Sequence, residues 1–195
     1  MNSANNNQVR ISQSPQGYRL ANDDQTDIVI LGPRGVTAAR LPPYPGWNYL
    51  RDRANAAWQE WKKETARHPI ERLGVRYINR IDVPIDAVVP FRVQDYVTFY
   101  PTVTPITDKD PLGYFVQVVI PTLSPKWNAT LTSTTLGADE VPRHVSLILD
   151  IDVMRTVDIP LNDTQLWPTI DEAQALKNDI FERCITPTAR KLFQS

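Results

Sequence analysis

The segment "ERLGVRYINRIDV", residues 71–83, constrains the fold most, because its side chains alternate in character with a period of two. In an extended strand, successive side chains point to opposite faces. The pattern therefore predicts a strand with one largely apolar face and one charged face. The apolar face receives Leu73, Val75, Tyr77, Asn79 and Ile81, and the charged face receives Arg72, Gly74, Arg76, Ile78, Arg80 and Asp82. What the arginines contact is the main functional question that this strand raises.

Other segments predict further strands in the same way. Residues 26–41 favour a β-hairpin, with "GPRG" as the turn. Three later segments also favour strands, and the Thr- and Ser-rich member suits an antiparallel sheet with one solvated face. These segments are "LGYFVQVVIP", "WNATLTSTTLG" and "HVSLILDIDVMR". The proline-rich stretch between residues 84 and 111 predicts an irregular excursion, with a short helical turn near "FRVQDYV".

Two long segments have the spacing of amphipathic helices. The first runs from Trp47 to near His68, where Pro69 ends it, and we expect its stripe to be core. The second opens near Asn162 or Asp163, and a short third helix follows with Thr186 as N-cap and Pro187 at its first position. The stripe residues are Trp47, Leu50, Ala54, Ala57, Trp58 and Trp61 in the first helix, and Leu166, Ile170, Ala173, Leu176, Ile180 and Cys184 in the second.

This order of elements predicts the α+β class, with a mostly antiparallel sheet and two long amphipathic helices packed on one face. A helix-grip arrangement and a saddle made of two strand–helix halves both fit. We expect a disordered polar tail over residues 1–8 and a single α+β domain over residues 9–195.

Composition excludes several kinds of site. The net charge is −1, from 21 basic and 22 acidic residues, so no overall field attracts nucleic acid or an anionic membrane. A single cysteine, Cys184, excludes an intramolecular disulfide and a cysteine-based zinc site, and His68 and His144 are the only histidines. The amino-terminal segment lacks the apolar core of a signal peptide, and no apolar run approaches membrane-spanning length. We therefore expect a cytoplasmic protein without a cofactor or a bound metal.

The segment "LILDIDV" offers a partner for the arginines, because Asp150 and Asp152 share one face of it. If the two strands are neighbours, Arg76 and Arg80 can pair with Asp150 and Asp152; we call these four residues the charge ladder. The alternative is a small-ligand or anion site, because an arginine fork matches carboxylate and phosphate. That site would use Arg72, Arg76, Arg80, Tyr77 and Asn79. We favour the ladder.

Catalytic motifs offer little. The chain has no glycine-rich phosphate loop, nucleophile elbow, paired-cysteine motif or His-x-x-x-His pattern, so we assign no catalytic residue. Asp150 and Asp152 could hold Mg²⁺ with a third carboxylate, which makes a metal-dependent phosphate-handling enzyme the least favoured hypothesis. A non-enzymatic protein-interaction module comes first and the small-ligand or anion-binding domain second.

Three segments carry a family resemblance: "IERLGVRYINRID", "LILDIDV" and "EAQALKNDIFERCITPTARKLF". They resemble a sporadically distributed bacterial family of uncharacterised proteins, as do "PQGYRL" and "RLPPYPGW", and the likeness spans most of residues 9–194. The resemblance implies no chemistry, because the family has no assigned function.

Members of that family usually begin with a further apolar strand, which this chain lacks before residues 9–20. A sheet without that strand exposes an edge that can pair with another chain. We therefore expect a homo-oligomer or a partner protein at that edge, the competing explanation being a start codon further upstream.

Overall fold

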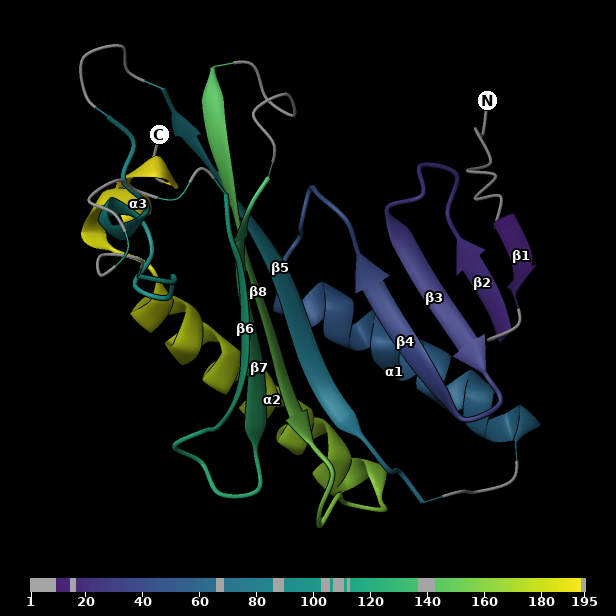
Figure 1. The fold of residues 1–195 in the computed structure, drawn as a ribbon. Helices are drawn as coiled ribbons and strands as arrows, with labels where there is room; N and C mark the ends of the chain where they lie inside the picture. Colours follow the sequence, from purple (N-terminus) through teal and green to yellow (C-terminus); the bar gives the residue numbers. More distant parts are fainter. Residues whose placement is uncertain are drawn as a thin grey trace. The chain divides into compact units, whose positions relative to one another are not determined.

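The computed structural model describes residues 10–14, 17–65, 69–85, 90–102, 106, 111, 113–136 and 143–193. The chain divides into two compact units, residues 1–68 and 69–195, and each contains a four-stranded antiparallel sheet and a long helix (Figure 1). The α+β class, the antiparallel strands and the two long helices are thus confirmed. The strands form two sheets instead of one, so each unit is a strand–helix half. The single domain over residues 9–195 stays a prediction.

The first unit is a meander of four strands followed by a helix. The strands are β1 (Arg10–Ser14), β2 (Gly17–Ala21), β3 (Asp27–Gly32) and β4 (Gly35–Arg40), and they lie in sequence order. The early segment is therefore a β1–β2 hairpin with β1 at the sheet edge, while Val9, Pro15 and Gln16 lie outside the described residues. Gly17 adopts φ +132°, and a Cβ there would lie 2.0 Å from the Leu31 carbonyl oxygen, so the hairpin requires glycine at this position.

Helix α1 (Trp47–Glu64) packs mainly on β4. Its buried anchor is Trp61, whose indole N–H donates to the carbonyl of Gly32 at 2.8 Å in the β3–β4 turn. Trp58 is only half-buried, and its ring stacks on Trp61 with centroids 5.4 Å apart. We expected the whole stripe to be core, but Trp61 is its one buried residue and the other five stripe residues are half-buried. The helix ends at Glu64, before the expected end near His68, which lies outside the described residues.

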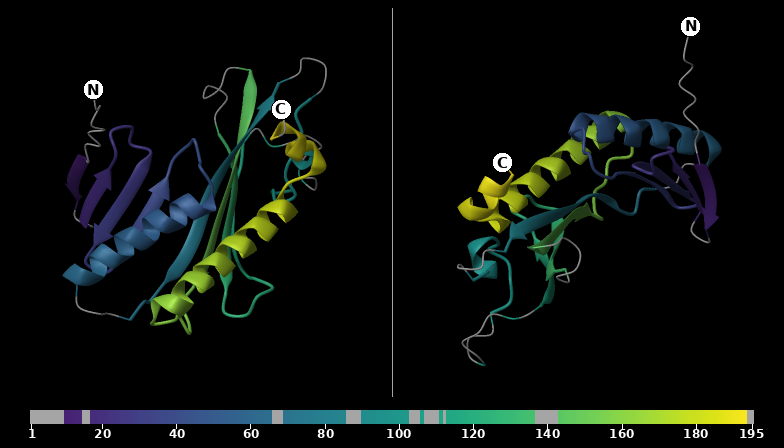
Figure 2. Two further views of the ribbon diagram at one scale, coloured as in Figure 1. Left: turned by 180° about the vertical axis from the view of Figure 1, so that it is seen from behind. Right: turned by 90° about the horizontal axis from the view of Figure 1, so that it is seen from above.

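The second unit has the strand order β5-β8-β7-β6. The strands are β5 (Leu73–Pro84), β6 (Phe115–Pro121), β7 (Asn128–Thr135) and β8 (His144–Arg155), and the helices are η1 (Val93–Asp95), α2 (Asp163–Cys184) and α3 (Pro187–Leu192). Figure 2 shows α2 along one face of this sheet, where it packs on β5 and β8. The alternation of β5 explains the core, because Val75, Ile81 and Val83 are buried on that face with four residues of β8. Those four are Leu147, Leu149, Ile151 and Val153.

The helix starts in this unit follow the capping rules. The Asn162 side chain accepts a hydrogen bond from the Gln165 N–H at 2.9 Å, and the Thr186 hydroxyl accepts one from the Ala189 N–H at 3.2 Å, with Pro187 at the first position. In the described part of the chain, no helix combines the length and the apolar character that crossing a membrane requires.

Candidate functional site

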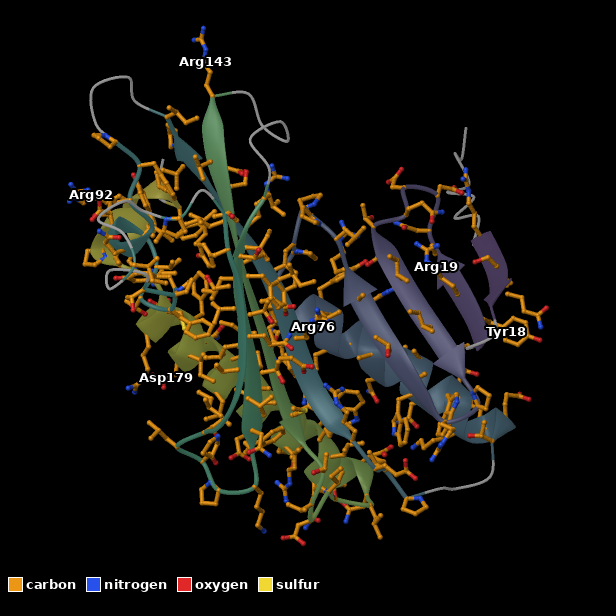
Figure 3. All side chains as sticks on the ribbon, in the orientation of Figure 1. Tyr18, Arg19, Arg76, Arg92, Arg143 and Asp179 are labelled. Carbon is orange, nitrogen blue, oxygen red and sulfur yellow. The ribbon has the colours of Figure 1, made fainter. Side chains whose placement is uncertain are left out.

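The charged face of β5 is the face of the second sheet turned away from α2, and the antiparallel register decides what lies beside it. Arg76 is directly opposite Asp152 on β8, which is opposite Thr130 on β7 and then Val119 on β6. The next row along the strands joins four further residues, namely Ile78, Asp150, Thr132 and Gln117. Figure 3 labels Arg76 on this sheet. The charged face is therefore a surface made by all four strands.

Each of the three arginines on the charged face, Arg72, Arg76 and Arg80, pairs with a different carboxylate. The Arg76 guanidinium donates two hydrogen bonds to the Asp150 carboxylate, at 2.9 Å from Nε to Oδ1 and 2.5 Å from Nη2 to Oδ2. Arg72 lies just before β5, and its Nη2 is 2.6 Å from Oδ2 of Asp152. Both hydrogen bonds connect the β5 side of the sheet to β8, and each arginine bonds to an aspartate that is not directly opposite it. The hydrogen bond to Asp150 raises the pKa of Arg76 above its ordinary value.

The third arginine differs from the expected charge ladder. Arg80 donates from Nε to Asp82 on its own strand at 2.8 Å, whereas Asp150 and Asp152 bind Arg76 and Arg72. The Ser146 hydroxyl also donates to Asp82, at 2.5 Å. Burial raises the pKa of Asp82, but the hydrogen bonds from Ser146 and Arg80 outweigh it and lower that pKa below its ordinary value. Residues i and i+2 of a strand share a face, which is why Arg80 reaches Asp82 first.

A small hollow lies between the ion pairs and β6. It has a volume of about 140 Å³ and is lined by polar side chains. Inside it, Gln117 donates to the Thr132 hydroxyl at 2.9 Å, and the second carboxylate oxygen of Asp152 is buried without a hydrogen-bond partner among the described residues. The lining residues are Arg76, Gln117, Thr130, Thr132, Asp150 and Asp152. Pockets for drug-sized ligands usually measure roughly 300–1,000 Å³, so this hollow is too small for a nucleotide and has room for a few waters or a small ion.

Two of the five residues predicted for a ligand site lie on the opposite face of the sheet. Asn79 donates from its side-chain amide to the Leu149 carbonyl at 3.0 Å, and Tyr77 lies beneath α2. The structure therefore does not bring Tyr77 and Asn79 together with Arg72, Arg76 and Arg80. This correction follows from strand alternation alone, because odd-numbered and even-numbered residues of β5 face opposite ways.

A buried lysine on α2 was missed by the sequence analysis. Lys177 is 6% exposed, its Nζ lies 3.7 Å from the centre of the Tyr77 ring, and it donates to the Asn178 side chain at 2.5 Å. Burial lowers its pKa from 10.5 to about 8. The sequence could have indicated this burial, because Lys177 lies at helical spacing between Ala173 and Cys184 on the buried stripe of α2. Lysine is rarely buried without a carboxylate, so the sequence analysis did not place it there.

The first unit contains a buried ion pair that the sequence analysis also missed. Asp27, 7% exposed, accepts a hydrogen bond from the Tyr49 hydroxyl at 2.6 Å and pairs with Arg40 at 2.9 Å. Burial raises the pKa of Asp27, but these two hydrogen bonds outweigh it and lower that pKa. The pair joins β3 and β4 to the first turns of α1, so its geometry is that of a structural tie.

Metal binding gains no support from the carboxylates. Asp150 and Asp152, the two candidates for a Mg²⁺ site, each accept a hydrogen bond from an arginine. Within the described ranges, no group of three or more His, Cys, Asp or Glu side chains could hold a metal ion. No protein-family model, no curated protein and no solved structure matches the chain.

Proposed function

We propose that this protein is a non-enzymatic protein-interaction module that binds an extended segment of another polypeptide along β6. The observation that carries the proposal is the place of β6 at the edge of its sheet, with backbone groups that face away from β7. Peptide segments bind such edges by adding a strand, with affinity from main-chain hydrogen bonds and specificity from alternate side chains.

The outward backbone groups follow from two hydrogen bonds at the ends of β6. The Thr135 N–H donates to the Tyr114 carbonyl at 3.3 Å, and the Thr122 N–H donates to the Trp127 carbonyl at 3.0 Å. Both pairs continue the β6–β7 register, in which hydrogen-bonded and non-hydrogen-bonded pairs alternate. Val116, Val118 and Ile120 therefore bond to β7, whereas Phe115, Gln117 and Val119 direct N–H and C=O outward. We call the outward groups of these last three residues the β6 edge.

The side chains of β6 do nothing to block pairing. Phe115 is 68% exposed and Val119 is 63% exposed, and no residue from Phe115 to Pro121 is charged. Edge strands are usually protected by charges, by proline or by a bulge. Both edge strands of this sheet end in a proline, Pro84 in β5 and Pro121 in β6, but only β5 adds charged side chains, its arginines and Asp82. An apolar, uncharged edge strand of seven residues is the form that an added strand binds.

The same surface argues against an anion site. Arg72, Arg76 and Arg80 are matched by Asp152, Asp150 and Asp82, so the local formal charge sums to zero. An anion would have to displace a carboxylate that is already hydrogen-bonded, and the hollow has no room for a nucleotide. The ion pairs of Arg72 and Arg76 instead tie β5 to β8 within the sheet.

The proposal is tested with a display library of extended peptides selected on the intact protein. Val119→Pro removes one outward N–H and leaves the bonds to β7, so peptides that bind the β6 edge should lose affinity. Ile78→Pro is the matched control, because Ile78 is also 63% exposed on an edge strand. The Ile85 N–H donates to the Arg143 carbonyl, so in the β5–β8 register the odd-numbered residues of β5 form the hydrogen bonds to β8. The N–H of the even-numbered Ile78 therefore points outward.

Selected peptides should bind the wild type and the Ile78→Pro variant alike and fail on Val119→Pro. Bound peptide should also slow amide hydrogen exchange at Phe115, Gln117 and Val119. The absence of any peptide whose binding depends on Val119 would refute the proposed function.

A further inference from the structure

We infer that the segment bound at the β6 edge is β6 of a second copy of this chain, in an antiparallel pair centred on Gln117. The inference rests on the proposed function and names its partner. The pairing would join two four-stranded sheets into one continuous sheet around a two-fold axis.

Self-pairing satisfies every outward group of the β6 edge. In an antiparallel pair centred on Gln117, Phe115 lies opposite Val119 of the second copy, and Gln117 lies opposite its own counterpart. All three positions carry outward N–H and C=O groups, so each meets a residue of the same kind, as a hydrogen-bonded pair requires. A centre at Val118 would instead place Phe115 opposite Pro121, which has no N–H to donate. The register centred on Gln117 is therefore self-complementary from Phe115 to Val119.

The side chains agree with that register on both faces. On the charged face, the exposed ring of Phe115 would cover Val119 of the second copy at each end of the pair. On the other face, Val116 would lie opposite Val118. At the centre, Gln117 donates only one N–H of its side-chain amide, to Thr132, which leaves its other N–H and its carbonyl for the amide of the second copy.

Charge and symmetry favour a second copy over the other edges of this sheet. β6 carries no charge, so bringing two copies together places no like charges opposite each other. Pairing of β6 with β5 of another copy would be head-to-tail, so it could continue from copy to copy without closing. The charged side chains of β5 also disfavour such pairing. The β6–β6 pair closes after two copies. A single edge contact buries less than the about 800 Å² per partner of a standard interface, so we expect dissociation in the micromolar range.

The test uses charge reversal at the two-fold axis in the intact protein. Gln117→Lys and Gln117→Glu each place like charges opposite each other, and we expect either change to raise the dimer dissociation constant roughly tenfold or more. An equimolar mixture of the two variants should restore the dimer, because it pairs opposite charges. Analytical ultracentrifugation over a wide micromolar range measures the three samples, and circular dichroism checks that each variant is folded. Val119→Pro is a second variant that should also dissociate the dimer.

Recovery in the mixture would support the inference, because a variant that simply misfolded could not be rescued by its partner. A wild-type protein that stays monomeric throughout would refute it. So would a dimer that survives Gln117→Lys and Val119→Pro. If the protein is monomeric but selected peptides still depend on Val119, the second copy is wrong and the proposed function stands. If both measurements fail, both are wrong.

Discussion

Replacing Lys177 with methionine should stabilise the protein at neutral pH. The lysine amine is almost fully buried between α2 and β5, with Asn178 and the Tyr77 ring as its contacts. No carboxylate pairs with it among the described residues. Methionine has a similar length and no charge, so the substitution removes the cost of burying an ammonium group without leaving a large cavity.

The magnitude follows from the pKa of Lys177, which burial lowers from 10.5 to about 8. At 1.36 kcal/mol per pH unit, that change corresponds to ~3 kcal/mol of unfavourable free energy for the charged form. The contact with Tyr77, a desolvated cation–π pair, returns roughly 1–2 kcal/mol, and Lys177→Met loses it. We therefore expect Lys177→Met to raise the free energy of unfolding by about 1–2 kcal/mol near neutral pH.

The pH dependence gives an independent check on the sign. The pKa of Lys177 is lower in the folded state, so the folded protein releases the proton first as pH rises. Below about pH 8 both states are protonated and the burial cost is present in full. Between about 8 and 10.5 the wild type gains stability with pH, whereas the Lys177→Met variant lacks this gain. The advantage of the variant should therefore shrink across that window.

Urea unfolding near pH 7 and near pH 9.5 measures both effects as midpoint shifts. Lys191→Met is the control, because Lys191 is exposed on α3 and its loss should change stability by no more than about 0.5 kcal/mol. A Lys177→Met variant that is less stable than the wild type near pH 7 would refute the reasoning. A stability difference that does not change with pH would show that burial does not perturb this amine.

Three further predictions concern the ion pairs and the core. Arg76 and Asp150 should show a coupling free energy of about 1 kcal/mol in a double-mutant cycle, because the pair is bidentate but half-exposed, and a coupling of zero would contradict this. Trp61→Ala should cost ~3–5 kcal/mol in urea unfolding, and Trp58→Ala roughly half of that, because only Trp61 is buried; equal costs would contradict the helix packing. Asp27→Asn should cost roughly 2–3 kcal/mol above pH 5. Because hydrogen bonds lower the folded pKa of Asp27, this cost should become smaller as pH falls through that pKa, and a cost that does not change with pH would contradict the assignment.

The sequence by itself determined the local features of this protein. The alternation over residues 71–83 divides β5 into a buried and a charged face, because side-chain direction in a strand depends only on the backbone of that strand. It also separates Tyr77 and Asn79 from the arginines. Asn162 and Thr186 begin α2 and α3 where their side chains predict, because a cap bonds to groups within three residues of itself.

Only the tertiary structure decided which residues meet across the sheet and which strand lies at its edge. Arg76 lies opposite Asp152 yet binds Asp150, and Arg80 prefers Asp82, because register and reach depend on pairings far apart in the sequence. Lys177 is buried because α2 packs on β5 and β8, and Lys177 lies on the side of the helix that contacts Tyr77 of the sheet. The segment "FVQVVIP" would suit a central strand equally well by composition. The strand order β5-β8-β7-β6 places it at the edge, since strand order is set by how all the strands pack together, and that position carries both proposals.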